Sequence, residues 1–357
     1  MENAAHIFLG ANSGGGFYSL YDQLLNGRLD DLLIIKGGPG CGKSGFMRTV
    51  AKELAAEGWE PVLVNCSGDP DSLDGVLFPA QKIGLVDGTA PHVLEPTYAV
   101  ASERYLDLTR FYDVEGTKAR RDEIVLHSDA YRAAYAEAYR ILRAADALED
   151  ERRAAVRAAV DFGKAARRLE SILRRELKGG GTRRGRVDRA FLGGMTHKGE
   201  LCRFDTAEAL CGRIVAVDDS FGLAADTLAR ICGEAAEAGY DVLACPNPGR
   251  PRELHHVLIP GAALAFVTST ARMPYTGEAY RRVRADALAA KGLTREQKAN
   301  LRLTARIGGS LREEATEALS RAKRAHDALE AAYNPCVDFD GVYALAAAEA
   351  KRLLQNH

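Results

Sequence analysis

The sequence predicts an α/β protein made of two tandem lobes, each a mostly parallel sheet with flanking helices and each followed by a long helical segment. Three observations support this fold class. An apolar strand pattern leads into a glycine-rich loop and then into a helical pattern between residues 32 and 56. The second half of the chain repeats the first half. A segment rich in Ala, Arg, Glu and Leu follows each half.

The glycine-rich loop is the strongest local signal. The apolar run 32–35 is followed by Gly-x-x-x-x-Gly-Lys-Ser at 37–44, which is the phosphate-binding pattern of P-loop NTPase-type lobes. Glycines let the backbone amides of such a loop point at phosphate oxygens, and the helix that follows adds partial positive charge. We therefore expect ATP and Mg²⁺ as cofactors, with Lys43 on the β/γ-phosphates and Ser44 on the metal. The residues expected to bind the nucleotide are Gly37, Gly38, Pro39, Gly40, Cys41, Gly42, Lys43, Ser44 and Gly45.

A second apolar run, 83–87, ends in Asp87 and is typical of a strand whose last carboxylate holds Mg²⁺. Many P-loop ATPases place a glutamate directly after this aspartate, but here the position is Gly88. Another side chain must then orient the attacking water or accept its proton. The catalytic candidates, besides Lys43 and Asp87, lie in loops expected after strand ends, where turn formation is the alternative explanation: Asp69, Asp71, Asp74 and His92.

Composition restricts the class of protein. The 357 residues are enough for about two domains, and the net charge of −1 predicts neither a nucleic-acid nor an anionic-membrane partner. Seven cysteines without a Cys-x-x-Cys pair favour a reduced, cytoplasmic protein. The chain begins without a signal-peptide pattern, and its apolar runs fall short of the ~18 residues of a membrane span. The nucleotide is the expected ligand, together with a substrate or protein partner that the sequence does not specify.

Composition shifts along the chain predict five segments. The helical segments have Ala/Arg/Glu/Leu patterns, the first with a break near Gly163, and they offer surfaces through which copies of the chain could associate. A Gly/Arg-rich stretch separates the two halves. The predicted limits are 1–120 for the nucleotide-binding lobe, 121–178 for a long helix or helical hairpin, 179–189 for the linker, 190–285 for a degenerate second lobe and 286–357 for the last helical segment.

The repeat has a constant offset of 181 residues from Ile34 onward. Ten of the 33 positions between 58 and 90 are identical to their partners, whereas typical compositions give roughly two by chance. The second copy keeps glycines, prolines and apolar strands but lacks the lysine for phosphate and the serine and carboxylates for the metal. At this offset the replacements are Leu223, Ala224 and Ala225 for Gly42, Lys43 and Ser44, Thr268 for Asp87, and Arg250, Arg252 and His255 for Asp69, Asp71 and Asp74. Arg250 or Arg252 could reach the nucleotide of the first copy as an arginine finger, or could be a surface arginine.

The motifs 10–17, 36–44, 66–75 and 86–92 together resemble a little-characterised bacterial family of duplicated P-loop ATP-binding proteins, named only as ATPases or nucleotide kinases. The resemblance covers nearly the whole chain, including the helical insert. It implies binding of ATP and Mg²⁺ and supplies no agreed substrate. Both halves can carry a phosphate loop in that family, and this chain departs from the pattern in its second half.

Three functions follow from these residues. The first is an ATPase with one active Mg-ATP site in the N-terminal lobe, which uses hydrolysis to drive or switch a conformational change. The second is a small-molecule or nucleotide kinase with the acidic loop 69–74 as acceptor site. The third is an ATP-sensing protein with negligible turnover, which Gly88 and the altered second lobe favour.

Overall fold

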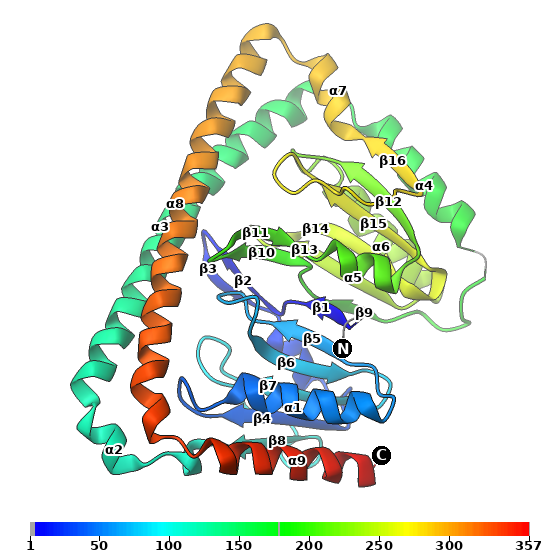
Figure 1. The fold of residues 1–357 in the computed structure, drawn as a ribbon. Helices are drawn as coiled ribbons and strands as arrows, with labels where there is room; N and C mark the ends of the chain where they lie inside the picture. The colour runs from blue at the N-terminus through cyan, green and yellow to red at the C-terminus, as the bar shows by residue number, and fades with distance from the viewer. Residues whose placement is uncertain (1–3, 178, 357) are drawn as a thin grey trace. The chain divides into compact units, whose positions relative to one another are not determined.

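The computed structural model describes residues 4–177 and 179–356, so the predicted segment limits at residues 1, 178 and 357 lie outside the described residues. The predicted α/β class is confirmed (Figure 1). The chain divides into two compact units that are discontinuous in sequence. Unit 1 is Met1–Gly10, Ser19–Ala138 and Thr316–His357, and unit 2 is Ala11–Tyr18 and Tyr139–Ala315. The five consecutive segments predicted from the sequence follow a different division of the chain, and their limits stay a prediction.

Unit 1 contains a six-stranded mixed sheet in the order β1-β5-β6-β7-β4-β8. Strands β7 and β8 flank β4 and run parallel to it, while β6 is antiparallel to both of its neighbours. The elements are β1 (Ala5–Ile7), η1 (Tyr21–Leu25), β4 (Asp31–Lys36), α1 (Lys43–Ala56), β5 (Val62–Asn65), β6 (Leu73–Phe78), β7 (Ile83–Asp87), β8 (Glu103–Asp107), η2 (Thr109–Phe111), α2 (Val114–Ala119), η4 (Asn334–Cys336) and α9 (Phe339–Asn356).

The core of unit 1 follows from the alternation along β4. Leu33 and Ile35 project into a cluster that also contains Phe46 of α1 and Val342 of α9, all fully buried. Strand residues alternate between faces, so Leu32 and Ile34, which are also fully buried, belong to the opposite face. A sheet buried on both faces explains why this strand reads as a continuous apolar run in the sequence.

Unit 2 repeats the architecture. Its six-stranded sheet has the order β9-β13-β14-β15-β12-β16, with the same parallel and antiparallel neighbours as its counterpart in unit 1. The elements are β2 (Gly10–Ser13), β3 (Gly16–Ser19), α4 (Gly163–Glu176), β9 (Val187–Arg189), β10 (Gly193–Thr196), β11 (Gly199–Cys202), α5 (Phe204–Leu210), β12 (Arg213–Asp218), α6 (Ala225–Glu237), β13 (Val242–Asn247), β14 (Arg250–Ile259), η3 (Pro260–Ala262), β15 (Leu264–Ser269), β16 (Arg281–Arg284) and α7 (Ala285–Gly292).

Helices cover both faces of the second sheet. Val215 and Val217 of β12 pack with α4 and α6, whereas Ile214 and Ala216 pack with α5. Strand β9 occupies the last three residues of the predicted linker 179–189, where it forms the edge of the sheet and pairs with β13. These three residues therefore extend the sheet.

Two long helices, α3 (Arg121–Ala159) and α8 (Arg295–Tyr333), contribute to both units. In unit 1 the two helices are joined by the ion pair between Arg321 and Glu137 (2.9 Å), and in unit 2 by the ion pair between Arg312 and Asp146 (3.3 Å). Helix α3 ends before Gly163, where α4 begins, so the break that the sequence indicates is present. Among the described residues, the structure contains no helix that is long and apolar enough to cross a membrane.

The register of the strands corrects the predicted alignment of the two halves. Strand β4 pairs Ile35 with Asp87, whereas β12 pairs Val217 with Thr268. The offset is therefore 182 residues in β4 and 181 in β7, and the gapless offset from Ile34 was wrong. Helix α6 is one residue shorter than α1, which absorbs the difference. Gly42, Lys43 and Ser44 correspond to Ala224, Ala225 and Asp226.

Candidate functional site

The loop between β4 and α1 turns at two glycines. Gly40 and Gly42 have φ angles of 69° and 83°, in the left-handed region that favours glycine. Gly42 then starts the helix, because its carbonyl accepts the first helical hydrogen bond from the amide of Phe46 (2.8 Å). The side chain of Cys41 is fully buried in the core, and burial raises the pKa of its thiol. Only the backbone of this cysteine can therefore serve a ligand.

Lys43 is the first residue of α1, and its side chain is folded back over the loop. The ammonium donates to the carbonyls of Gly37 (3.0 Å) and Gly38 (2.9 Å). It also lies 3.6 Å from a carboxylate oxygen of Asp87. Asp87 reaches this position because β7 runs parallel to β4 and ends beside the loop. The structure thus brings together the cation and the carboxylate that the sequence singles out.

The oxygens of Ser44 and Asp87 suit a magnesium ion in kind. Mg²⁺ prefers hard oxygen ligands and is commonly bound by one or two carboxylates together with phosphate oxygens. The hydroxyl of Ser44 accepts a hydrogen bond from the amide of Leu73 (3.0 Å). One oxygen of Asp87 accepts from the amide (2.8 Å) and hydroxyl (2.6 Å) of Thr89, which fixes the carboxylate and leaves its other oxygen toward Lys43. Ser44 and Asp87 would hold the metal. Gly45 follows Ser44 in the first turn of α1.

Asp74 lies deepest of the three candidate aspartates. It belongs to β6 and not, as expected, to the acidic loop, because the strand begins at Leu73. Burial and the nearby charge of Asp87 raise the pKa of Asp74 to about 7. Its carboxylate accepts a hydrogen bond from the hydroxyl of Tyr21 (3.2 Å) and lies 3.3 Å from a ring nitrogen of His92.

His92 is buried beside Asp74, and burial lowers the pKa of its imidazole to about 4. Because the pKa of Asp74 lies above that of His92, the carboxyl group is largely protonated and the imidazole is neutral at mildly acidic pH. The ring of Tyr21 packs against the ring of His92 with centroids 4.7 Å apart. Asp74, His92 and Tyr21 therefore form a connected polar group beside Asp87.

Asp69 and Asp71 do not join this group. Asp69 forms an ion pair with Lys323 of α8 (3.4 Å), and it also accepts the amide of Asp71 (3.2 Å) in a tight turn. Asp71 is exposed. The turn explanation therefore accounts for these two residues, and the acidic stretch 69–74 does not act as one cluster.

Several contacts of the loop come from residues that the sequence analysis did not select. The hydroxyl of Tyr112 donates to the carbonyl of Pro39 (2.8 Å), and the amide nitrogen of Asn334, oriented to suit its partners, donates to the carbonyl of Gly40 (3.1 Å). Both residues are distant in sequence from the loop, and no local pattern in the sequence indicates that they reach it.

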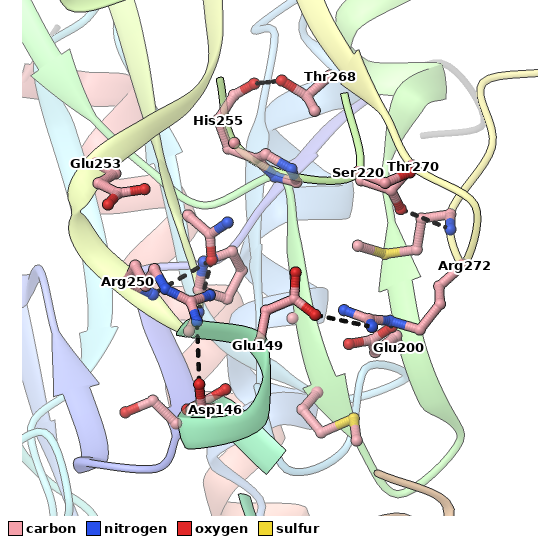
Figure 2. Close-up of a pocket in the computed structure, with 18 of the residues that line it drawn as sticks. Asp146, Glu149, Glu200, Ser220, Arg250, Glu253, His255, Thr268, Thr270 and Arg272 are labelled. Carbon is pink, nitrogen blue, oxygen red and sulfur yellow. Dashed lines mark hydrogen bonds and ion pairs between the residues drawn. The ribbon is translucent and has the colours of Figure 1, made fainter. Parts of the chain in front are cut away.

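The corresponding edge of unit 2 has different chemistry. Ala225 and Asp226 replace Lys43 and Ser44, and a polar cavity opens where Thr268 and His255 replace Asp87 and Asp74 (Figure 2). The guanidinium of Arg250 pairs with Asp150 (2.6 and 2.8 Å). Arg252 is exposed. Within its own unit, Arg250 is thus a structural cation.

A scan of protein-family models, a search of curated proteins and a search of solved structures found no match for this chain. The function must therefore be argued from the chemistry of the described residues.

Proposed function

We propose that unit 1 is a P-loop nucleotide-binding lobe that binds one Mg-ATP at residues 37–45 and hydrolyses it. The observation that carries the proposal is the contact between the ammonium of Lys43 and the carboxylate of Asp87, 3.6 Å apart, at the end of a glycine-rich loop in which Ser44 is the next residue. A cation for phosphate and two hard oxygens for a divalent metal are what phosphoryl transfer requires. The family resemblance in the sequence supports the same proposal.

The loop would hold the phosphates through its backbone amides and through the positive end of α1. The ammonium of Lys43 would exchange the carbonyls of Gly37 and Gly38 for oxygens of the β- and γ-phosphates. Magnesium supplies neutralisation of the phosphate charge. Ser44, in the first turn of α1 after β4, and Asp87, at the end of the neighbouring strand β7, would hold the metal ion.

Asp74 is the residue best placed to accept the proton of the attacking water. In hydrolysis the water oxygen bonds to the γ-phosphorus, the bond from that phosphorus to the bridging oxygen breaks, and a water proton must leave. A carboxylate with a pKa of about 7 is a stronger base than an ordinary aspartate and is still partly ionised at neutral pH. His92 and Tyr21 hold this carboxylate in place.

Contacts between the loop and the helical segment support the conformational part of the proposal. Asn334, directly after α8, contacts the carbonyl of Gly40, and Lys323 of α8 pairs with Asp69. If hydrolysis changes the conformation of the loop or of residues 69–73, these contacts would transmit the change to α8. Hydrolysis would thereby switch the position of this end of α8 within unit 1.

Transfer of the γ-phosphoryl group to a small molecule is the second candidate. The same base, Asp74, would then take the proton of an acceptor hydroxyl. The separation of Asp69 and Asp71 from Asp74 argues against the acidic stretch as the acceptor site. Turnover that requires a particular acceptor would favour this second function.

Calorimetric titration with Mg-ATP tests the proposed site. We expect about one nucleotide per chain, and we expect Lys43→Ala to weaken binding at least about 10-fold and up to about 100-fold, as the loss of charged hydrogen bonds implies. Lys52→Ala is the matched control, because Lys52 lies on the same helix with an exposed side chain. Equal affinities of the Lys43→Ala variant and the unaltered protein would overturn the proposed site.

A further inference from the structure

The loop that precedes α6 in unit 2 keeps one of the two left-handed turns of the loop in unit 1 and begins with a different residue. With the offset of 182, Gly222 corresponds to Gly40, and their φ angles are 63° and 69°. Asp219 stands at the position of Gly37, directly after β12. The second loop thus keeps the left-handed turn at Gly222 and loses the one at Gly42, because the corresponding Ala224 has a φ of −84°. It also gains a carboxylate at its start.

The carboxylate of Asp219 is bound by the backbone of its own loop. One oxygen accepts from the amides of Leu223 (2.9 Å) and Phe221 (3.3 Å), and the other accepts from the amide of Ala224 (2.8 Å). The side chain is almost completely buried. Amides at the end of such a loop and at the start of a helix are the groups that hold a phosphate in other proteins. In this loop the carboxylate of Asp219 accepts the hydrogen bonds of these amides.

A cavity borders this loop, so the loop that holds the Asp219 carboxylate lies next to open space. Asp219, Ser220 and Gly222 line it together with His255 and Thr268, which Figure 2 shows joined across adjacent strands through the backbone carbonyl of His255. The arginines that line the cavity are each paired with a carboxylate: Arg153 with Glu253, Arg250 with Asp150, Arg272 with Glu200 and Arg312 with Asp146. Their charge is therefore already balanced.

We propose that Asp219 is a built-in anion that fills the loop 219–225 and closes the second unit to phosphate. The proposal explains how a loop without the lysine and serine of unit 1 stays ordered. Nests of backbone amides are stabilised by an anion, and this chain supplies that anion covalently. The contact between the Asp219 carboxylate and these amides would thus inhibit phosphate binding by the same loop. This proposal does not depend on nucleotide binding by unit 1.

The test replaces the internal anion with an external one. In the Lys43→Ala protein, which silences the loop of unit 1, we expect Asp219→Gly to lower the thermal unfolding midpoint by about 5 °C through the loss of three charged hydrogen bonds. Inorganic phosphate at high millimolar concentration should recover about half of this loss relative to chloride at equal ionic strength. Asp219→Ser, which keeps one capping oxygen and still leaves room, should show the same recovery if the glycine variant does not fold.

Two matched variants make the outcome specific. Asp219→Asn fills the loop with a neutral side chain, so its midpoint should fall without recovery by phosphate. Asp226→Gly introduces the same residue at an exposed position of the first turn of α6, and phosphate should not favour it over chloride. The proposal is overturned if Asp219→Gly is as stable as its parent, or if phosphate fails to raise the midpoint of Asp219→Gly above its value in chloride. It is also overturned if phosphate raises the midpoint of Asp226→Gly as much as that of Asp219→Gly.

Discussion

Replacement of Asp74 by asparagine should stabilise the protein without nucleotide, and the gain should grow with pH. Burial and the charge of Asp87 raise the pKa of Asp74 to about 7, whereas an unfolded aspartate titrates near 3.8. Between these values the folded state keeps a proton that the unfolded state has released, so the free energy of unfolding falls as pH rises. Below pH 3.8 both states are protonated and the cost disappears.

The magnitude follows from the shift. At about 1.4 kcal/mol per pKa unit, ionised Asp74 costs about 4 kcal/mol above pH 7, and about 2.5 kcal/mol of this cost develops between pH 5 and pH 8. Asparagine has nearly the same shape and cannot ionise. The variant should therefore gain about 2.5 kcal/mol relative to the unaltered protein when the pH is raised from 5 to 8.

Urea unfolding at pH 5 and pH 8, with a chelator and without nucleotide, measures this gain. Asp71→Asn is the matched control, because Asp71 is exposed and lies three residues away, and its effect should be the same at both values of pH. A difference between Asp74→Asn and the unaltered protein that does not change with pH would refute the reasoning.

Two further predictions concern the same site. His92→Gln should reduce the loss of stability in acid. Burial lowers the pKa of His92 to about 4, below its ordinary 6.5, so the unfolded state binds a proton before the folded state does. The free energy of unfolding of the unaltered protein should therefore fall by up to about 3 kcal/mol as the pH drops from 6.5 to 4, and glutamine removes this contribution. Urea unfolding at pH 4.5 and pH 7 measures this, and equal slopes for both proteins would contradict it. Gly40→Ala should cost more than the roughly 1 kcal/mol of Gly58→Ala, because both glycines have positive φ but only the Cβ at residue 40 meets other groups. These are the side-chain amide of Asn334 at 2.8 Å and the backbone of Glu330 at 3.1 Å. Equal unfolding free energies of the two variants would show that the contact is absent.

The sequence predicts those parts of the fold and site that local pattern determines. Within fifteen residues the chain contains the apolar run of β4, the glycines of the loop and the start of α1 at Lys43. The local order of these residues is therefore enough to predict the strand, the loop and the helix. Asp87 was selected because it ends an apolar run, and the parallel pairing of β7 with β4 places it beside Lys43. The selection of each residue needed no long-range information, whereas their contact depends on the pairing of the two strands.

Other features depend on contacts between distant segments. Asp74 was assigned to a loop because Asp-Gly is a common turn pair, but pairing with β5 and β7 draws it into β6 and buries it. Asn334 and Lys323 reach the site through the packing of α8, and a helical pattern does not show which neighbour it meets. The register shift in unit 2 lies in a loop and helix with few identities, so counting identical residues did not detect it.

The central claim is that one site, in unit 1, turns over Mg-ATP. Phosphate release from Mg-ATP by the purified protein, with Lys43→Ala and Lys52→Ala measured in parallel, tests it most directly. The account predicts steady release without an added acceptor, abolished in Lys43→Ala and retained in Lys52→Ala. Release that persists in Lys43→Ala, or one tightly bound nucleotide with no release, would contradict hydrolysis at this site.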